Sequence, residues 1–77
     1  MPRFHFNVYD GKANIDSDGT DFDTWEDARV GAICSIGYEL MDDAKRIALG
    51  EEWRMEVTDD AGLVLLRLDF SMIALAP

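Results

Sequence analysis

The sequence predicts an α+β domain in which one long helix covers one face of a four-stranded antiparallel sheet, in the chain order ββαββ. Three observations predict this architecture. Only residues 24–49 have the length and the helical spacing of apolar residues that a substantial helix needs. The segments before and after it alternate apolar and polar residues with a period of two, as half-buried strands do. Asp-Gly pairs and an Asp-Asp-Ala-Gly run separate these segments as turns. We expect 77 residues to form a single domain, residues 1–77.

The first two strands are predicted at residues 3–9 and 20–22. The apolar face of the first consists of Phe4, Phe6 and Val8. Residues 12–17 are weakly patterned, which fits either a loop or irregular pairing. The second strand is short and leads directly into the helix.

The helix is predicted over residues 24–49, with Asp23 or Thr24 as its N-cap and Gly50 as its stop. At about 100° per residue, one apolar stripe emerges and is predicted to be buried. It consists of Ile33, Ile36, Gly37, Leu40, Ala44 and Ile47. Gly37 on this stripe suggests a close approach to the sheet, whereas the sequence offers no reason for Gly31.

The last two strands are predicted at residues 52–58 and 63–70, followed by an apolar tail at 71–77. Both strand pairs read as hairpins, and the helix makes the second and third strands parallel to each other. Of the orders that keep both hairpins, only 2-1-3-4 is antiparallel throughout, and antiparallel pairs are the commoner kind. The fourth strand is then an edge with apolar residues on both faces.

An apolar edge strand is a site for pairing with another chain. We therefore expect two copies to meet there and form a homodimer. The residues expected at this surface are Leu63, Leu65, Met72 and Ile73.

The composition is strongly acidic, with 16 Asp and Glu against 7 Lys and Arg and a net charge of −9. This charge argues against binding to nucleic acid or to anionic membranes. It favours solubility and leaves room for a basic protein partner or a divalent cation. We expect no cofactor. No apolar run suggests a signal peptide or a membrane span, so we expect a cytoplasmic protein.

The acidic stretch 14–27 is similar in part to a calcium-binding loop, with a glycine at the sixth position. The twelfth position, where such loops carry a bidentate acid, is Trp25, and Glu26 comes one place late. A turn rich in Asp and Gly explains the same pattern. The candidate ligands are Asn14, Asp16, Asp18, Asp21 and Glu26.

No arrangement of residues predicts catalysis. His5 is the only histidine, and general-base chemistry would need a carboxylate such as Asp69 or Glu56 beside it. The only cysteine, Cys34, lies on the flank of the helix stripe, where a small buried side chain is expected. The sequence leaves open whether Trp25 and Trp53 belong to the core or to the surface. We expect a protein that is not an enzyme.

A set of short motifs runs along the chain: Met1-Pro2-Arg3-Phe4 with Phe6, Asp10-Gly11, Asp18-x-x-Asp21-Phe22, Ala28-Arg29 with Ala32, and Trp53-x-Met55-Glu56-Val57-Thr58-Asp59-x-x-Gly62. On these motifs the chain resembles a family of short bacterial proteins of unknown function, about 70–80 residues long and common in rhizobia and their relatives. The resemblance implies a stand-alone domain and supplies no catalytic residue. A similarity at the level of fold class also connects it with antitoxin domains that neutralise basic toxins, by analogy only.

Taken together, these features predict a small acidic interaction domain that binds another protein or itself. The alternatives are a divalent-metal-responsive module that uses the acidic stretch 14–27, and an antitoxin-like neutraliser of a basic partner.

Overall fold

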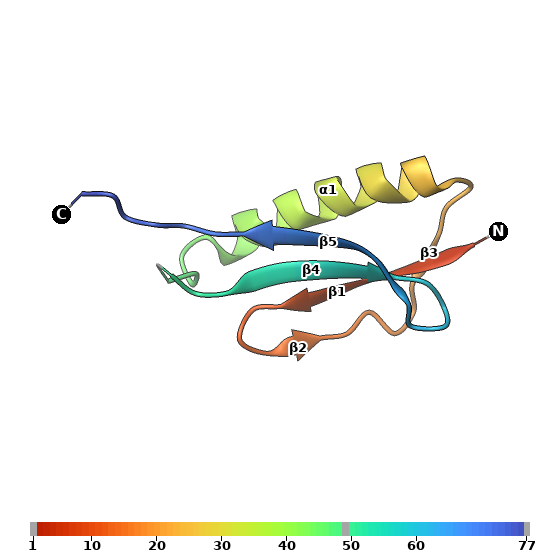
Figure 1. Cartoon of the computed structure of the whole chain (residues 1–77), viewed down its shortest axis with the longest axis horizontal. Helices are drawn as coiled ribbons and strands as arrows, with labels where there is room; N and C mark the ends of the chain where they lie inside the picture. Colours follow the sequence, from red (N-terminus) through yellow and green to blue (C-terminus); the bar gives the residue numbers. More distant parts are fainter. Residues whose placement is uncertain (1, 49, 77) are drawn as a thin grey trace.

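One helix lies across one face of an antiparallel sheet in the computed structural model, which describes residues 2–48 and 50–76 (Figure 1). The elements are β1 (Arg3–Tyr9), β2 (Ala13–Asn14), β3 (Thr20–Asp21), α1 (Trp25–Asp43), β4 (Trp53–Thr58) and β5 (Val64–Phe70). The α+β class and the single helix are confirmed. The predicted helix 24–49 is too long at its end, because α1 ends at Asp43 and residues 44–48 are turn and irregular chain, so Gly50 does not stop the helix. Leu49 and the predicted domain ends at Met1 and Pro77 lie outside the described residues.

The sheet differs in detail from the predicted four strands and their order. It has five strands in the order β2-β1-β4-β5, with β3 also paired to β1. β2 pairs with the Tyr9 end of β1, and β3 pairs with the Arg3 end. Between these two short strands, a side chain replaces the backbone ladder, because the Phe6 N–H donates to Asp16 Oδ2 (3.1 Å). The single predicted strand at 20–22 is therefore only part of this edge.

The core lies between α1 and the middle of the sheet. Trp53, Met55 and Val57 of β4 are fully buried and face the helix side. The register places Phe6 opposite Val57 and Val8 opposite Met55. On the other side of β4, the apolar residues of β5 continue the same face. They are Leu66, Leu68 and Phe70, all partly buried.

The helix is rotated relative to the predicted stripe. Its fully buried residues are Ala28 and Ala32, while Ile33 is 50% exposed. Two small alanines let the helix axis come close to the bulky β4 side chains, so the row Ala28, Ala32, Ile36 and Leu40 faces the sheet. The predicted stripe counted apolar bulk and missed that the closest contact favours the smallest side chains.

The close approach expected at one of the two helix glycines occurs at the other, for which the sequence offered no reason. A Cβ atom on Gly31 would lie 2.7 Å from Cζ of Phe22, so the ring packs directly on the helix backbone there. A Cβ on Gly37 would meet no atom within 4 Å. The close approach predicted at Gly37 is wrong, and Gly31 is the residue where it occurs.

Both ends of α1 follow from local hydrogen bonds. Thr24 is the N-cap, since its Oγ1 accepts a hydrogen bond from the Asp27 N–H (3.1 Å). The helix ends at Asp43, whose carbonyl accepts hydrogen bonds from the N–H groups of Arg46 and Ile47. Within the described residues, no helix combines the length and the apolar character needed to cross a membrane.

Candidate interaction surface

Strand β5 forms one edge of the sheet. It pairs with β4 from Trp53↔Phe70 to Thr58↔Val64, with an irregularity next to Thr58. Within residues 2–48 and 50–76, no strand pairs with its other side. The backbone groups on that side are available to another strand, as at any open sheet edge.

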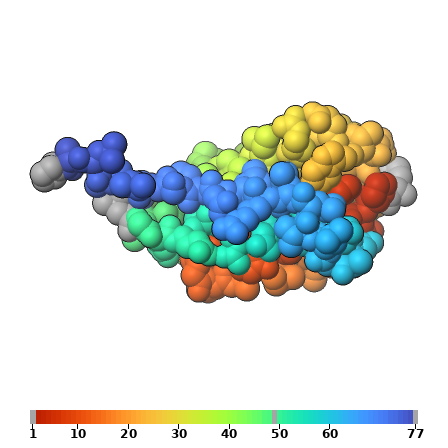
Figure 2. All heavy atoms as spheres, in the orientation of Figure 1, coloured from red at the N-terminus to blue at the C-terminus, as the bar shows by residue number. Residues whose placement is uncertain are grey.

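Apolar side chains gather at both ends of this edge. The exposed fractions are 63% for Leu63, 37% for Leu65, 37% for Met72 and 74% for Ile73. These are the four residues expected from the sequence, and Val64 is also exposed. We call these five residues the edge surface. Figure 2 shows β5 and the tail as a continuous blue band along the molecule.

The tail is attached where it leaves β5. The Gly50 N–H donates to the Met72 carbonyl (3.2 Å), which holds residue 72 beside the connection between α1 and β4. Beyond this contact, the chain extends away from the sheet (Figure 1). The apolar side chains of the tail therefore continue the line of the strand.

Two opposite charges lie in the middle of β5, on the sheet face away from the helix. Arg67 Nε donates to both carboxylate oxygens of Asp69 (3.0 and 3.1 Å), and both side chains are about half exposed. On β4, Glu56 is opposite Arg67, and Arg54 is opposite Asp69. The middle of the edge is thus polar on one face, between its apolar ends.

The acidic stretch 14–27 runs from β2 through β3 into the first turn of α1, and its candidate ligands make contacts within the protein. The Asn14 amide donates to Asp10 Oδ1 (3.3 Å), Asp21 pairs with Arg3, and Glu26 pairs with Arg29. The Asp18 carbonyl accepts from Arg3 Nη1 (2.8 Å). In the part of the chain that the structure describes, no three His, Cys, Asp or Glu residues are placed to hold one metal ion.

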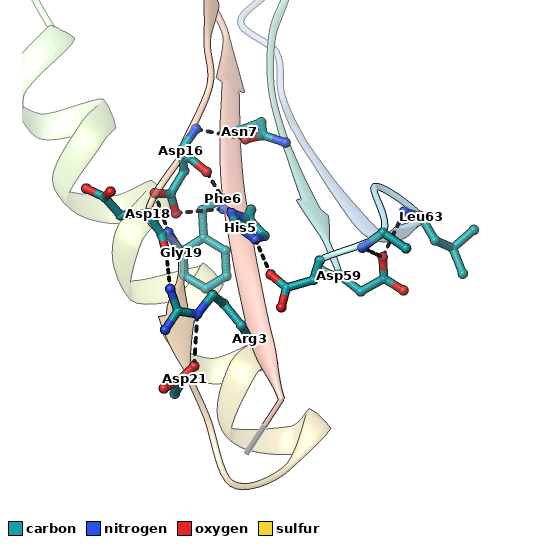
Figure 3. A network of polar contacts seen from close by, with 12 residues as sticks. Arg3, His5, Phe6, Asn7, Asp16, Asp18, Gly19, Asp21, Asp59 and Leu63 are labelled. Carbon is teal, nitrogen blue, oxygen red and sulfur yellow. Dashed lines mark hydrogen bonds and ion pairs between the residues drawn. The ribbon is translucent and has the colours of Figure 1, made fainter.

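Asp16 connects the segment between β2 and β3 to β1 by hydrogen bonds (Figure 3). Its carboxylate accepts hydrogen bonds from the N–H groups of Phe6 (3.1 Å) and Gly19 (3.0 Å). Its own N–H donates to Asn7 Oδ1 (2.9 Å). Of the five candidate ligands, Asp16 has its carboxylate committed to backbone donors, which is a structural role.

His5 is held by acceptors at both ring nitrogens. Nδ1 lies 2.7 Å from the Asp16 carbonyl, and Nε2 lies 2.7 Å from Asp60 Oδ1. The Asp60 carboxylate, followed by the Asp16 carbonyl, raises the pKa of His5 above 6.5. Both acceptors favour the doubly protonated ring, which is a poor general base. A hollow of about 370 Å³ lies beside it on the open sheet face.

Sequence reasoning missed Asp60 because it lies in the β4–β5 turn, 55 positions from His5. It also missed apolar exposure on α1, where Val30 and Met41 face outward. Cys34 is exposed on the same helix, contrary to expectation. The two tryptophans differ in burial: Trp53 belongs to the core and is 1% exposed, whereas Trp25 is 43% exposed at the helix start.

Comparison with known proteins gives one match. The model of a family described as "Domain of unknown function (DUF6894)" matches residues 3–71. No curated protein matches the chain, and no solved structure matches it.

Proposed function

Because the chain belongs to the DUF6894 family, a domain of unknown function, we propose a role from its own surface: a small acidic interaction domain, not an enzyme, that binds protein through β5 and the tail. The edge surface, Leu63, Val64, Leu65, Met72 and Ile73, is the binding site in this proposal. Its occupant is another protein chain or a second copy of this one.

The observation that carries the proposal is the open side of β5 with apolar residues at both ends. Natural edge strands are commonly protected by charges, prolines or covering segments. β5 has one Arg–Asp pair in its middle and exposed apolar side chains beside it. Main-chain pairing supplies affinity in strand addition, and the flanking side chains supply specificity.

The His5 geometry supports a role that is not enzymatic. Both of its ring nitrogens are occupied by acceptors of the protein itself, Asp16 and Asp60. A substrate proton would therefore have to displace one of these hydrogen bonds.

Light scattering at tens of micromolar tests the proposal in its simplest form. We expect a mass above that of one chain for the wild type, and a lower mass for the double variant Leu65→Thr with Ile73→Ser. Ile15→Ser is the control, because the exposed fraction of Ile15, 59%, lies between those of Leu65 and Ile73, but Ile15 lies beside β2 at the opposite side of the sheet. Equal masses for the wild type and the double variant would count against the edge surface as a self-binding site.

A basic protein partner is the second candidate, favoured by the net charge of −9. Attraction between opposite charges steers association and weakens as salt screens it. Binding in this case would be retained at low salt and lost at about 0.5 M NaCl. Binding unaffected by that change would argue against an antitoxin-like neutraliser.

A divalent-metal-responsive loop at residues 14–27 remains an alternative proposal. Trp25 lies at the end of this loop and is partly exposed, so its fluorescence would report a change there. A calcium titration that leaves the emission unchanged at millimolar concentration would remove this alternative.

A further inference from the structure

We propose that the occupant of the β5 edge is a second copy of this chain, paired antiparallel with Leu68 facing Leu68 of the second copy. This inference rests on the proposed function and specifies its partner. It is carried by the order of side chains along residues 66–70 and by the register of β5 on β4.

Two-fold symmetry restricts the registers. A symmetric antiparallel pair has one residue that faces its own copy, and residues equally far before and after that centre then face each other. Both helices lie on the same face of the joined sheet. The three centres in the middle of the edge are Arg67, Leu68 and Asp69.

Charge selects among these centres. A pair centred on Arg67 would place two guanidinium groups opposite each other, and one centred on Asp69 would oppose two carboxylates. Like charges directly opposite each other destabilise a sheet. Centring on Leu68 places Arg67 opposite Asp69 of the second copy, and this pair occurs twice.

Charges on β4 extend this pattern. Glu56 lies opposite Arg67, and Arg54 lies opposite Asp69, within one chain. Across the joined sheet, each row of opposed side chains would consist of Glu56 and Arg67 of one copy, followed by Asp69 and Arg54 of the second copy. The charges alternate in sign along the whole row, which a register centred on Arg67 or Asp69 does not achieve.

The apolar residues in the continuous part of the strand match in the same register. On the helix face, Leu66 would lie opposite Phe70 of the second copy. The ladder shifts between Val57 and Thr58, so Val64 pairs with Thr58 and is out of step with residues 66–70. The charged pairs and the Leu66–Phe70 pairs are thus satisfied by one alignment of the strand with itself, and Leu63 and Val64 lie beyond the shift.

A charge-reversal experiment tests this register. Arg67→Asp alone and Asp69→Arg alone each create two like-charge contacts in a symmetric pair. Each variant should raise the dissociation constant of the dimer about ten- to a hundred-fold, as measured by sedimentation equilibrium. An equimolar mixture of the two variants should form a heterodimer, because an all-acidic strand then faces an all-basic one. Rescue by mixing excludes misfolding as the cause of the single losses.

Disulfide trapping locates the centre independently. In a Cys34→Ser background, Leu68→Cys should cross-link to itself on oxidation. Directly opposite residues in an antiparallel pair have Cα atoms about 4.5–5.5 Å apart, within the range of about 4.4–6.8 Å seen in disulfides. Arg67→Cys and Asp69→Cys should each cross-link poorly, because neither residue would face its own copy.

The outcomes separate the register from the binding role. A wild-type dimer that the edge-surface double variant dissociates, but that neither charge reversal weakens, would overturn the register alone. Efficient cross-linking at position 67 or 69 in place of 68 would do the same. A wild-type monomer at tens of micromolar would overturn both this register and self-binding through the edge surface.

Discussion

At the scale of single residues, Asp16 shows how a side chain can replace a strand. The chain between β2 and β3 turns away from β1, which leaves the Phe6 N–H without a backbone acceptor from that side. The Asp16 carboxylate fills this place and also binds the Gly19 N–H, where the backbone φ of +72° favours glycine. The Asp16 carboxylate thus contributes both to the conformation of this segment and to its position on the sheet, together with the contacts from Arg3, His5 and Asn7.

Asp16→Ala should lower the free energy of unfolding by about 1–3 kcal/mol, because two part-buried N–H groups lose their acceptor. Urea denaturation followed by tryptophan fluorescence measures the change. Asp18→Ala is the matched control, since the contact of Asp18 with Arg3 uses its backbone carbonyl. Equal losses for the two variants would show that general loop acidity, and not this pair of hydrogen bonds, determines stability.

His5 should titrate with a midpoint above 6.5, because Asp60 and the Asp16 carbonyl both favour the protonated ring. A folded pKa above the unfolded value means that the contribution of His5 to stability is fully present below about pH 6.5. It is lost as the pH rises through the folded pKa. Asp60→Asn should move the midpoint down in an NMR titration of the imidazole signals, while Asp18→Asn should leave it nearly unchanged. A midpoint at or below 6.5 in the wild type would contradict the hydrogen bonding described for His5.

At the scale of elements, α1 shows which properties of a helix the spacing of apolar residues predicts and which it does not. Its start at the Thr24 cap and its place between the two groups of strands follow from spacing and capping residues, and the structure agrees, whereas the helix ends at Asp43 and not at the predicted residue 49. Its rotation does not follow, because the pattern weighted Ile33 above Ala32, although only alanine allows the helix to approach Trp53 and Met55 closely. Which helix residues are buried was therefore determined by the size of the side chain that fits against the sheet, and not by its hydrophobicity.

Gly31→Ala should destabilise the fold by about 1–3 kcal/mol, because the new Cβ would lie 2.7 Å from the Phe22 ring. Gly37→Ala should instead stabilise it by about 0.5–1 kcal/mol, since the site is open and alanine is the better helix former. Thermal melts of the two variants compare the same substitution in the same helix. Stabilisation by Gly31→Ala would mean that Phe22 does not pack on the helix as described.

Among the strands, those with alternating apolar and polar residues were predictable from the sequence, and the short edge strand was not. Alternation correctly located β1, β4 and β5, because period two is a direct consequence of strand geometry. The first edge was missed in detail because Ala13–Asn14 has no alternation and is paired through its contact with Tyr9 and Val8. The link between His5 and Asp60 joins residues 55 positions apart, and no local signal marks it. The family resemblance is confirmed as a short domain of unknown function, while its rhizobial origin and shared motif stay predictions.

At the scale of the whole molecule, net charge opposes compaction. A charge of −9 is confined to a chain with a radius of gyration of 13.5 Å. At 10 mM salt the screening length is about 30 Å, so these charges repel one another across the whole domain. At 150 mM it falls to about 8 Å, and most of this repulsion is screened. The surface ion pairs of this chain contribute little to stability, because water screens them, and the same salt weakens them further.

Raising NaCl from 10 to 150 mM should therefore increase the free energy of unfolding by about 1–2 kcal/mol, since screened repulsion outweighs the weakened pairs. Urea titrations at the two salt concentrations measure this. Repeating them with calcium chloride at matched ionic strength separates screening from binding, because only a bound ion adds stability beyond the sodium value. Equal free energies of unfolding in sodium chloride and calcium chloride would mean that cations act only by screening charge. A decrease with NaCl would mean that the ion pairs, including Arg67 with Asp69, outweigh the net charge of the chain.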